Sequence, residues 1–214
     1  EEIVRIVTTE GPDRVRELMA LGVRFQKGKN GEGFDLGMEG GHSARRVAHA
    51  SDLTGKEIER ALLEQIAANP NIEVLENHLA IDLLIESKAR GRDRTNGDRC
   101  LGAYVLNRVS GEVETRIAGV TVLCTGGCGK VYLYTTNPDI ATGDGVAMAY
   151  RAGAKVANLE FIQFHPTCFF NREAKNFLIS EAVRGEGGIL INQQGEAFMK
   201  KYDDRGDLAT RDAV

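Results

Sequence analysis

The run Val120-Thr121-Val122-Leu123-Cys124 leads directly into Thr125-Gly126-Gly127-Cys128-Gly129. Its first half is apolar almost throughout, which is typical of a strand that is buried on both faces of a parallel sheet. Glycines that follow such a strand let a ligand approach the backbone closely, and open α/β sheets bind ligands at this edge. The segment therefore predicts an α/β fold with a glycine-lined ligand site at a strand end.

Further elements are predicted on both sides of this segment. Residues 54–68 have one apolar helical face, with Thr54 placed to cap the helix and Glu57 three residues later. Strands are predicted over residues 72–76, 80–87, 100–107 and 113–117, and short helices over 144–154 and 178–184.

The N-terminal part is predicted to be helical and then irregular. Residues 3–21 show helical spacing around Gly11-Pro12, so we expect two helical pieces that are broken there, with Gly22 as the C-terminal cap. Residues 26–41 contain six glycines and predict a loop with short strands.

Composition narrows the class of protein. The chain has 214 residues, 42% of them hydrophobic and 27% charged, which is ordinary for a globular protein. The formal net charge of -4 argues against a nucleic-acid partner. No apolar run reaches the ~18 residues of a membrane span, and no signal peptide is visible, so we expect a cytoplasmic protein. The chain starts at Glu1 rather than Met, and we expect it to begin inside a longer protein.

No metal site is predicted. Cys124 and Cys128 are four residues apart, but no second close pair or nearby histidine completes a zinc set. A G-x-G-x-x-G dinucleotide fingerprint is also missing, since Gly31-Glu32-Gly33 lacks the third glycine and follows no apolar strand. Residue patterns alone therefore do not name a reaction.

Six segments in order nevertheless resemble one flavoprotein family. They are Glu39-Gly40-Gly41-His42-Ser43-Ala44-Arg45-Arg46, Cys124-Thr125-Gly126-Gly127, residues 137–145, residues 160–167, residues 180–187 and Leu208-Ala209-Thr210-Arg211-Asp212. The resemblance is to the family of L-aspartate oxidases and of fumarate reductase and succinate dehydrogenase flavoproteins, and it covers essentially the whole chain.

The resemblance implies a fold and a cofactor. In this family a Rossmann-type FAD-binding domain is interrupted by an α+β capping domain. We expect residues 1–157 to belong to the FAD-binding domain and residues 158–214 to begin the capping domain. The family's glycine fingerprint and its returning half would lie outside this chain, which we therefore expect to be an incomplete fragment, inactive alone. Expected FAD contacts, by resemblance, are Leu79, Ala80, Thr125, Gly126, Gly127 and Asp144.

The same resemblance implies the active-site residues. His165 would bind a substrate carboxylate, with Gln163 on the same strand face. Ser180 would donate a hydrogen bond to a carboxylate from the face of a helix that it shares with Arg184. Arg211 matches the family's acid/base arginine, with Glu181 and Arg184 as its relay; an ordinary surface pairing of these charges is the alternative.

Glu39 indicates the branch of the family. By resemblance, L-aspartate oxidases have an acidic residue here, whereas fumarate reductases and succinate dehydrogenases do not. A carboxylate at this place favours a substrate with an ammonium group over a plain dicarboxylate. An ordinary loop glutamate is the alternative.

The resemblance then implies oxidation of L-aspartate to iminoaspartate, with FAD as hydride acceptor and O2 or fumarate reoxidising it. This reaction is the first step of de novo NAD biosynthesis, and quinolinate synthase would consume the product. Two alternatives stay open. One is a fumarate reductase or succinate dehydrogenase flavoprotein subunit, and the other is a fragment that has no catalytic role.

Overall fold

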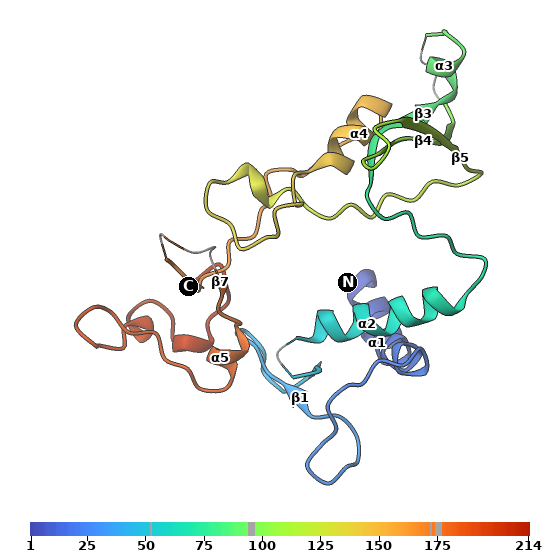
Figure 1. Ribbon diagram of the computed structural model, residues 1–214. Helices are drawn as coiled ribbons and strands as arrows, with labels where there is room; N and C mark the ends of the chain where they lie inside the picture. The colour runs from blue at the N-terminus through green and yellow to red at the C-terminus, as the bar shows by residue number, and fades with distance from the viewer. Residues whose placement is uncertain (52, 94–96, 172, 174–176) are drawn as a thin grey trace. The chain divides into compact units, whose positions relative to one another are not determined.

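The computed structural model describes residues 1–51, 53–93, 97–171, 173 and 177–214, and it forms two compact units (Figure 1). Unit 1 consists of Glu1–Glu73, Phe164–Phe169 and Leu178–Val214, and unit 2 consists of Val74–Gln163 and Phe170–Phe177. The expected mixture of helices and strands is confirmed. The Rossmann-type and capping character of the domains, with limits 1–157 and 158–214, stays a prediction about the family's fold.

Unit 1 opens with helix α1 (Glu2–Ala20), which continues through Pro12. The expected break at this proline is wrong. A proline removes one intrahelical hydrogen bond, and the remaining turns here keep their helical geometry. Gly22 ends the helix as predicted, because its φ of +100° suits glycine. The N–H groups of Gly22 and Val23 donate to carbonyls of the last turn at 2.9 and 3.0 Å.

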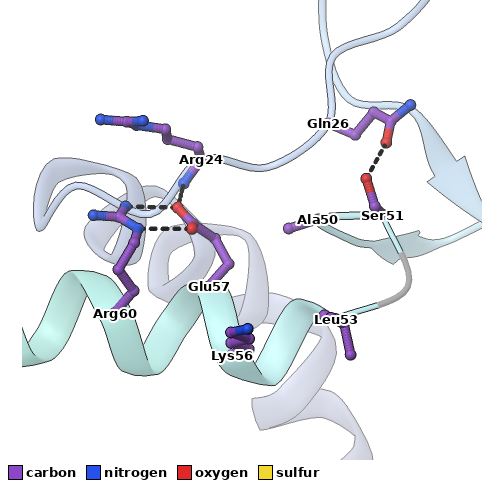
Figure 2. A pocket seen from close by; sticks show the side chains of 8 residues that line it. All are labelled: Arg24, Gln26, Ala50, Ser51, Leu53, Lys56, Glu57 and Arg60. Atoms are coloured by element: carbon purple, nitrogen blue, oxygen red, sulfur yellow. Dashed lines mark hydrogen bonds and ion pairs between the residues drawn. The ribbon is translucent and has the colours of Figure 1, made fainter.

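Helix α2 (Thr54–Ala68) has the predicted bounds, but the predicted cap is wrong. The hydroxyl of Thr54 accepts a hydrogen bond from the N–H of Ala50 at 3.1 Å, so it does not cap the helix. The carboxylate of Glu57 accepts from the N–H of Arg24 at 2.9 Å instead of reaching back to the start of the helix (Figure 2).

The side chains of α2 hold the end of α1. Arg60 forms an ion pair with Glu57 at 2.7 Å and donates to the carbonyl of Gly22 at 2.9 Å. Gln65 donates to the carbonyl of Leu21 at 3.2 Å. These bonds satisfy carbonyl groups that the end of α1 would otherwise leave unpaired.

The rest of unit 1 is built from short elements. Strands β1 (Leu36–Gly37) and β2 (Val47–Ala48) pair in antiparallel fashion, which confirms the predicted loop with short strands. The predicted helix over residues 178–184 is shorter than expected, because Leu178 belongs to a strand. The other elements are β6 (Cys168–Phe169), β7 (Phe177–Leu178), whose first residue belongs to unit 2, α5 (Ala182–Gly185), η2 (Met199–Lys201) and η3 (Gly206–Leu208).

Unit 2 contains a three-stranded antiparallel sheet. Its order is β3 (His78–Ile85), β4 (Cys100–Asn107), β5 (Val113–Ile117). The bounds of β4 and β5 are those predicted, whereas residues 72–76 do not form the predicted strand. Helix α3 (Glu86–Ala89) follows β3, and η1 (Gly129–Val131) and α4 (Asp144–Ala152) come later in the chain.

The core of unit 2 lies between α4 and β3, which are drawn side by side in Figure 1. Leu83 and Ile85 of β3 pack with Met148, which is 1% exposed. Arg151 of α4 donates to the carbonyl of Ile81 at 2.9 Å. These contacts fix the position of α4 on the sheet.

The apolar run Val120–Cys124 is not a strand, which corrects the first prediction. Val120 is 80% exposed and Val122 is 75% exposed. A strand buried on both faces needs hydrogen-bonding strands beside it. Within the described ranges no strand pairs with this run, so its backbone stays irregular.

Candidate active site

Four charged side chains of unit 1 meet in one group, which we call the charge cluster: Glu39, Glu181, Arg184 and Arg211. Glu181 Oε1 accepts a hydrogen bond from Arg184 Nη2 at 2.7 Å. Its other oxygen, Oε2, accepts from Arg211 Nε. Arg211 Nη2 in turn donates to Glu39 Oε2 at 3.1 Å. The four charges therefore form an alternating series from Glu39 to Arg184.

Glu181 and Arg184, at one end of the series, are buried. The side chains of Glu181 and Arg184 are each 3% exposed, whereas those of Glu39 and Arg211 are each 33% exposed. Buried charges persist only when they are paired and hydrogen-bonded. Both conditions hold for Glu181, because each of its oxygens faces a guanidinium group.

Arg184 is also bonded to the backbone. Its Nη1 donates to the carbonyls of Asp207 at 2.7 Å and of Ala209 at 3.2 Å. Its buried Nε has no hydrogen-bond partner among the residues that the structure describes. Arg184 thus ties α5 to the segment that leads into Arg211.

Two glycines allow the loop that carries Glu39 to lie close to the other residues of the charge cluster. A Cβ atom at Gly40 would lie 2.5 Å from Glu181 Oε1 and 3.0 Å from the carbonyl oxygen of Ala209. A Cβ at Gly185 would overlap the carbonyl of Met38. The loop of residues 38–46 therefore lies directly on α5, and the absence of side chains at these two glycines makes this approach possible.

An ion pair outside the cluster fastens the same loop. Arg45 binds Glu186 through two hydrogen bonds of 2.5 and 2.8 Å and donates to the carbonyl of Leu36 at 3.3 Å. The hydrogen bonds and the charge of Arg45 hold the pKa of the Glu186 carboxyl below its ordinary value. Nothing in the sequence indicated this pair, because its partners are far apart along the chain.

His165 and Ser180 lie in unit 1, and their expected roles toward a substrate carboxylate stay predictions. His165 is partly buried, and its Nδ1 lies 2.8 Å from the carbonyl oxygen of Thr167. The same Nδ1 lies 3.3 Å from the backbone nitrogen of Thr167, so the tautomer of the ring decides whether Nδ1 donates to the carbonyl or accepts from the N–H. Ser180 precedes α5 and accepts from the N–H of Ala182 at 3.3 Å, so the expected helical face that it would share with Arg184 is wrong.

Gln163 belongs to unit 2 and lies in an irregular segment. The strand face that it was expected to share with His165 is therefore wrong, because residues 161–165 form no strand. Its role toward a substrate stays a prediction.

The expected FAD contacts all lie in unit 2. A Cβ at Gly145 would overlap the side chain of Thr125, so Thr125 lies against the first turn of α4. Gly126 has a φ of +73°. Within the described part of the chain, none of the backbone N–H groups of residues 125–127 donates to another backbone group.

This arrangement fits a phosphate-bearing cofactor. Helix N-termini and glycine turns offer N–H groups to anions. Asp144 starts α4 and is exposed, and Leu79 and Ala80 lie on β3, which packs against the same helix. The residues present therefore fit FAD as regards backbone access.

The comparisons with known proteins extend over all these segments. The family described as FAD binding domain matches residues 1–214. The chain belongs to this family. The match confirms the family predicted from the six segments, and FAD as its cofactor.

Curated relatives are L-aspartate oxidases from bacteria and plants. L-aspartate oxidase 1 of Ralstonia nicotianae is 52% identical over 215 residues, which cover 100% of this chain and 40% of that protein. L-aspartate oxidase 2-b, chloroplastic, of Nicotiana tabacum is 50% identical, with 100% of this chain and 33% of that protein covered. The chain thus spans well under half the length of these relatives.

Solved structures with a similar fold include fumarate reductases and Mycobacterium smegmatis Sdh1, which has a TM-score of 0.71 and 35% identity over 91% of this chain and 32% of that one. A single-residue variant of the Escherichia coli quinol fumarate reductase FrdA has a TM-score of 0.84 and 28% identity, covering 96% of this chain and 35% of that one. A flavocytochrome c3 fumarate reductase in its open conformation has a TM-score of 0.67 and 27% identity, covering 95% and 34%.

Neither a membrane-spanning helix nor a metal-binding group of side chains is found among the described residues. None of the helices in the described ranges combines the length and the apolar character that a bilayer span requires. Among the same residues, no three His, Cys, Asp or Glu side chains are grouped so that they could hold a metal ion.

Proposed function

We propose that this chain supplies the substrate-binding residues and part of the FAD-binding residues of an L-aspartate oxidase, which converts L-aspartate to iminoaspartate. The observation that carries the proposal is the position of Glu39. Its carboxylate is part of the charge cluster and accepts a hydrogen bond from Arg211 at 3.1 Å. The relatives that are about 50% identical over the whole chain support the same substrate.

The residues of this chain would bind the substrate through its separate charged groups. His165 and Ser180 hold substrate carboxylates, with Gln163 as a further polar contact. Glu39 attracts the substrate ammonium group, which fixes the orientation of the α-carbon. FAD, when bound, accepts the hydride from that carbon. The protein therefore contributes position and electrostatics rather than redox chemistry.

Proton transfer at the substrate is assigned to Arg211 with its relay. A guanidinium gives up a proton only at high cost, since its pKa in water exceeds ~12. Glu181 lies between Arg211 and Arg184 and is bonded to both. A buried carboxylate in this position can pass a proton between the two guanidinium groups, which makes Glu181 and Arg184 the relay.

The proposed reaction also needs an electron acceptor and belongs to a biosynthetic pathway. Reoxidation by O2 or fumarate completes the cycle, and the reaction opens de novo NAD biosynthesis, with quinolinate synthase consuming the unstable imine. We propose that the enzyme works in the cytoplasm without a membrane or nucleic-acid partner.

The test compares wild type with Glu39→Gln in the full-length protein that contains this chain. Peroxide release that depends on L-aspartate supports the proposal, and its absence from FAD-loaded wild type contradicts it. Loss of the carboxylate should raise the KM for L-aspartate about 10-fold or more, the effect of roughly 1.4 kcal/mol. Glu196→Gln, which removes an exposed carboxylate of unit 1, is the matched control.

A fumarate reductase or succinate dehydrogenase flavoprotein is the second candidate, because of the fold shared with fumarate reductases. The same assay separates the two. Rapid reduction by succinate without any response to L-aspartate favours the second candidate. A third view, that the isolated chain is not catalytic, is tested by adding FAD to the chain and recording its absorbance after gel filtration.

A further inference from the structure

The turn that carries Glu39 contains two glycines. The N–H of His42 donates to the carbonyl of Glu39 at 3.1 Å, which closes a turn around Gly40 and Gly41. Gly41 has a φ of +77°, a value that favours glycine. Because glycine allows more backbone conformations than other residues, the turn alone does not fix where the side chain of Glu39 lies. Contacts outside the turn must hold it in place.

One such contact lies at the far end of the loop of residues 38–46. Arg45 Nη1 and Nη2 donate to the two carboxylate oxygens of Glu186 at 2.5 and 2.8 Å, although the two residues are 141 positions apart. Two parallel bonds between a guanidinium and a carboxylate fix the orientation of the groups as well as their distance. Glu186 directly follows α5, the helix that contains Arg184. The pair therefore ties the loop to a helix that contributes to the charge cluster.

The Arg45–Glu186 pair is separate from the cluster itself. Within the described residues, neither partner forms an ion pair with a member of the cluster. The two side chains are 51% and 54% exposed. Ion pairs as exposed as this one contribute little to the stability of a fold. The effect of the pair is therefore local, because it restricts where the loop can lie relative to α5.

We propose that Arg45 and Glu186 are positioning residues for Glu39: their ion pair holds the loop on α5 and so prepares the Glu39 carboxylate for the substrate. Without the pair, the glycine-containing turn is ordered only when substrate binds, and this ordering weakens binding. The KM for L-aspartate then rises while kcat changes little, because the bound substrate meets the same groups. This inference rests on the proposed function and adds two residues that act on the substrate through Glu39.

The test uses steady-state kinetics of the full-length, FAD-loaded protein. Arg45→Met and Glu186→Gln should each raise the KM for L-aspartate about 5-fold, and the double variant should show the same rise rather than the product of the two. The kcat should stay within about 2-fold of wild type. Arg14→Met, which breaks an equally exposed pair in α1, is the matched control and should leave the KM unchanged.

A second comparison separates positioning from a general loss of structure. In a Glu39→Gln background, Arg45→Met should raise the KM by less than about 2-fold, because the group that it positions is already removed. An equal rise with and without the Glu39 carboxylate would overturn the inference, as would an unchanged KM in both single variants. If Arg45→Met loses FAD, Arg45→Lys takes its place, since lysine keeps the charge but not the two parallel bonds.

Hydrogen exchange follows the loop without any substrate. The N–H of Gly41 donates to the carbonyl of Leu208 at 2.7 Å, so its exchange should be faster in Arg45→Met than in wild type. Unchanged exchange would mean that the pair does not hold the loop, and the inference would be wrong. Wild type that does not oxidise L-aspartate would instead contradict the proposed function, whereas the exchange rate would still decide whether Arg45 holds the loop.

Discussion

Arg184 is the buried arginine of the charge cluster. It binds Glu181 and two backbone carbonyls, and its side chain is 3% exposed. Removal of one member of a buried ion pair leaves a charge without compensation, which is more costly than replacement of the whole pair by apolar groups.

We therefore expect Arg184→Met to lower the free energy of unfolding of this chain by about 3–5 kcal/mol. Arg14→Met is the matched control, because the pair that Arg14 forms with Glu17 is 62% and 57% exposed. That change should cost less than about 1 kcal/mol. Urea unfolding of both variants checks the difference, and equal losses would mean that burial does not govern this pair.

The sequence predicted single residues better than the contacts between them. Glu39, Glu181 and Arg211 were identified by their motifs, and the structure brings them together. Ser180 was assigned to a helix because residues 178–184 have helical spacing, but pairing of β7 delays the start of that helix. Strand pairing is a tertiary effect, and local spacing does not contain it.

Among the elements, α4 is the one that bears on cofactor binding. Its first turn lies against Thr125, and Gly145 provides the space for that side chain. An added methyl group at Gly145 would push the glycine segment of residues 125–127 away from the helix.

Gly145→Ala should accordingly weaken FAD binding by the full-length protein, by about 10-fold if the displacement costs roughly 1–2 kcal/mol. Gly119→Ala is the control, because no atom outside its chain neighbours lies within 4 Å of a Cβ at that position. Titration of apoprotein with FAD measures both. Unchanged affinity in Gly145→Ala would show that this contact does not position the cofactor segment.

Elements with a strong local pattern were predicted closely, as α2, β4 and β5 show. Elements that depend on distant partners were not. The run Val120–Cys124 has the composition of a buried strand but no strand beside it among the described residues. The rule that a proline breaks a helix also gave a wrong prediction for α1, because this helix continues through Pro12.

At the scale of the whole molecule, the carboxylates of the surface ion pairs link stability to pH. Hydrogen bonds from Arg60 and from the N–H of Arg24 lower the pKa of Glu57 to about 2. Hydrogen bonds from Arg205 lower the pKa of Asp203 to about 2. A hydrogen bond from the side chain of Asn107 likewise lowers the pKa of Glu114.

The sign of the effect follows from these directions. Each carboxyl has a lower pKa in the folded chain than in the unfolded chain, so below the unfolded value the unfolded state binds more protons. The stability that these groups contribute is complete above about pH 4.5 and is lost as the pH falls toward 2. We expect the free energy of unfolding to decrease steadily over this window.

Glu57→Gln should make this decrease less steep, because the amide does not titrate, while it lowers stability at pH 7 through the weaker bonds to Arg24 and Arg60. Glu32→Gln, at an exposed loop position, should keep the wild-type slope. Urea unfolding at intervals between pH 7 and pH 2.5 measures both curves. If the free energy of unfolding of Glu57→Gln falls with pH in parallel with that of wild type, proton binding at Glu57 is not coupled to folding. The contacts between α1 and α2 would then not contribute to the pH dependence of stability.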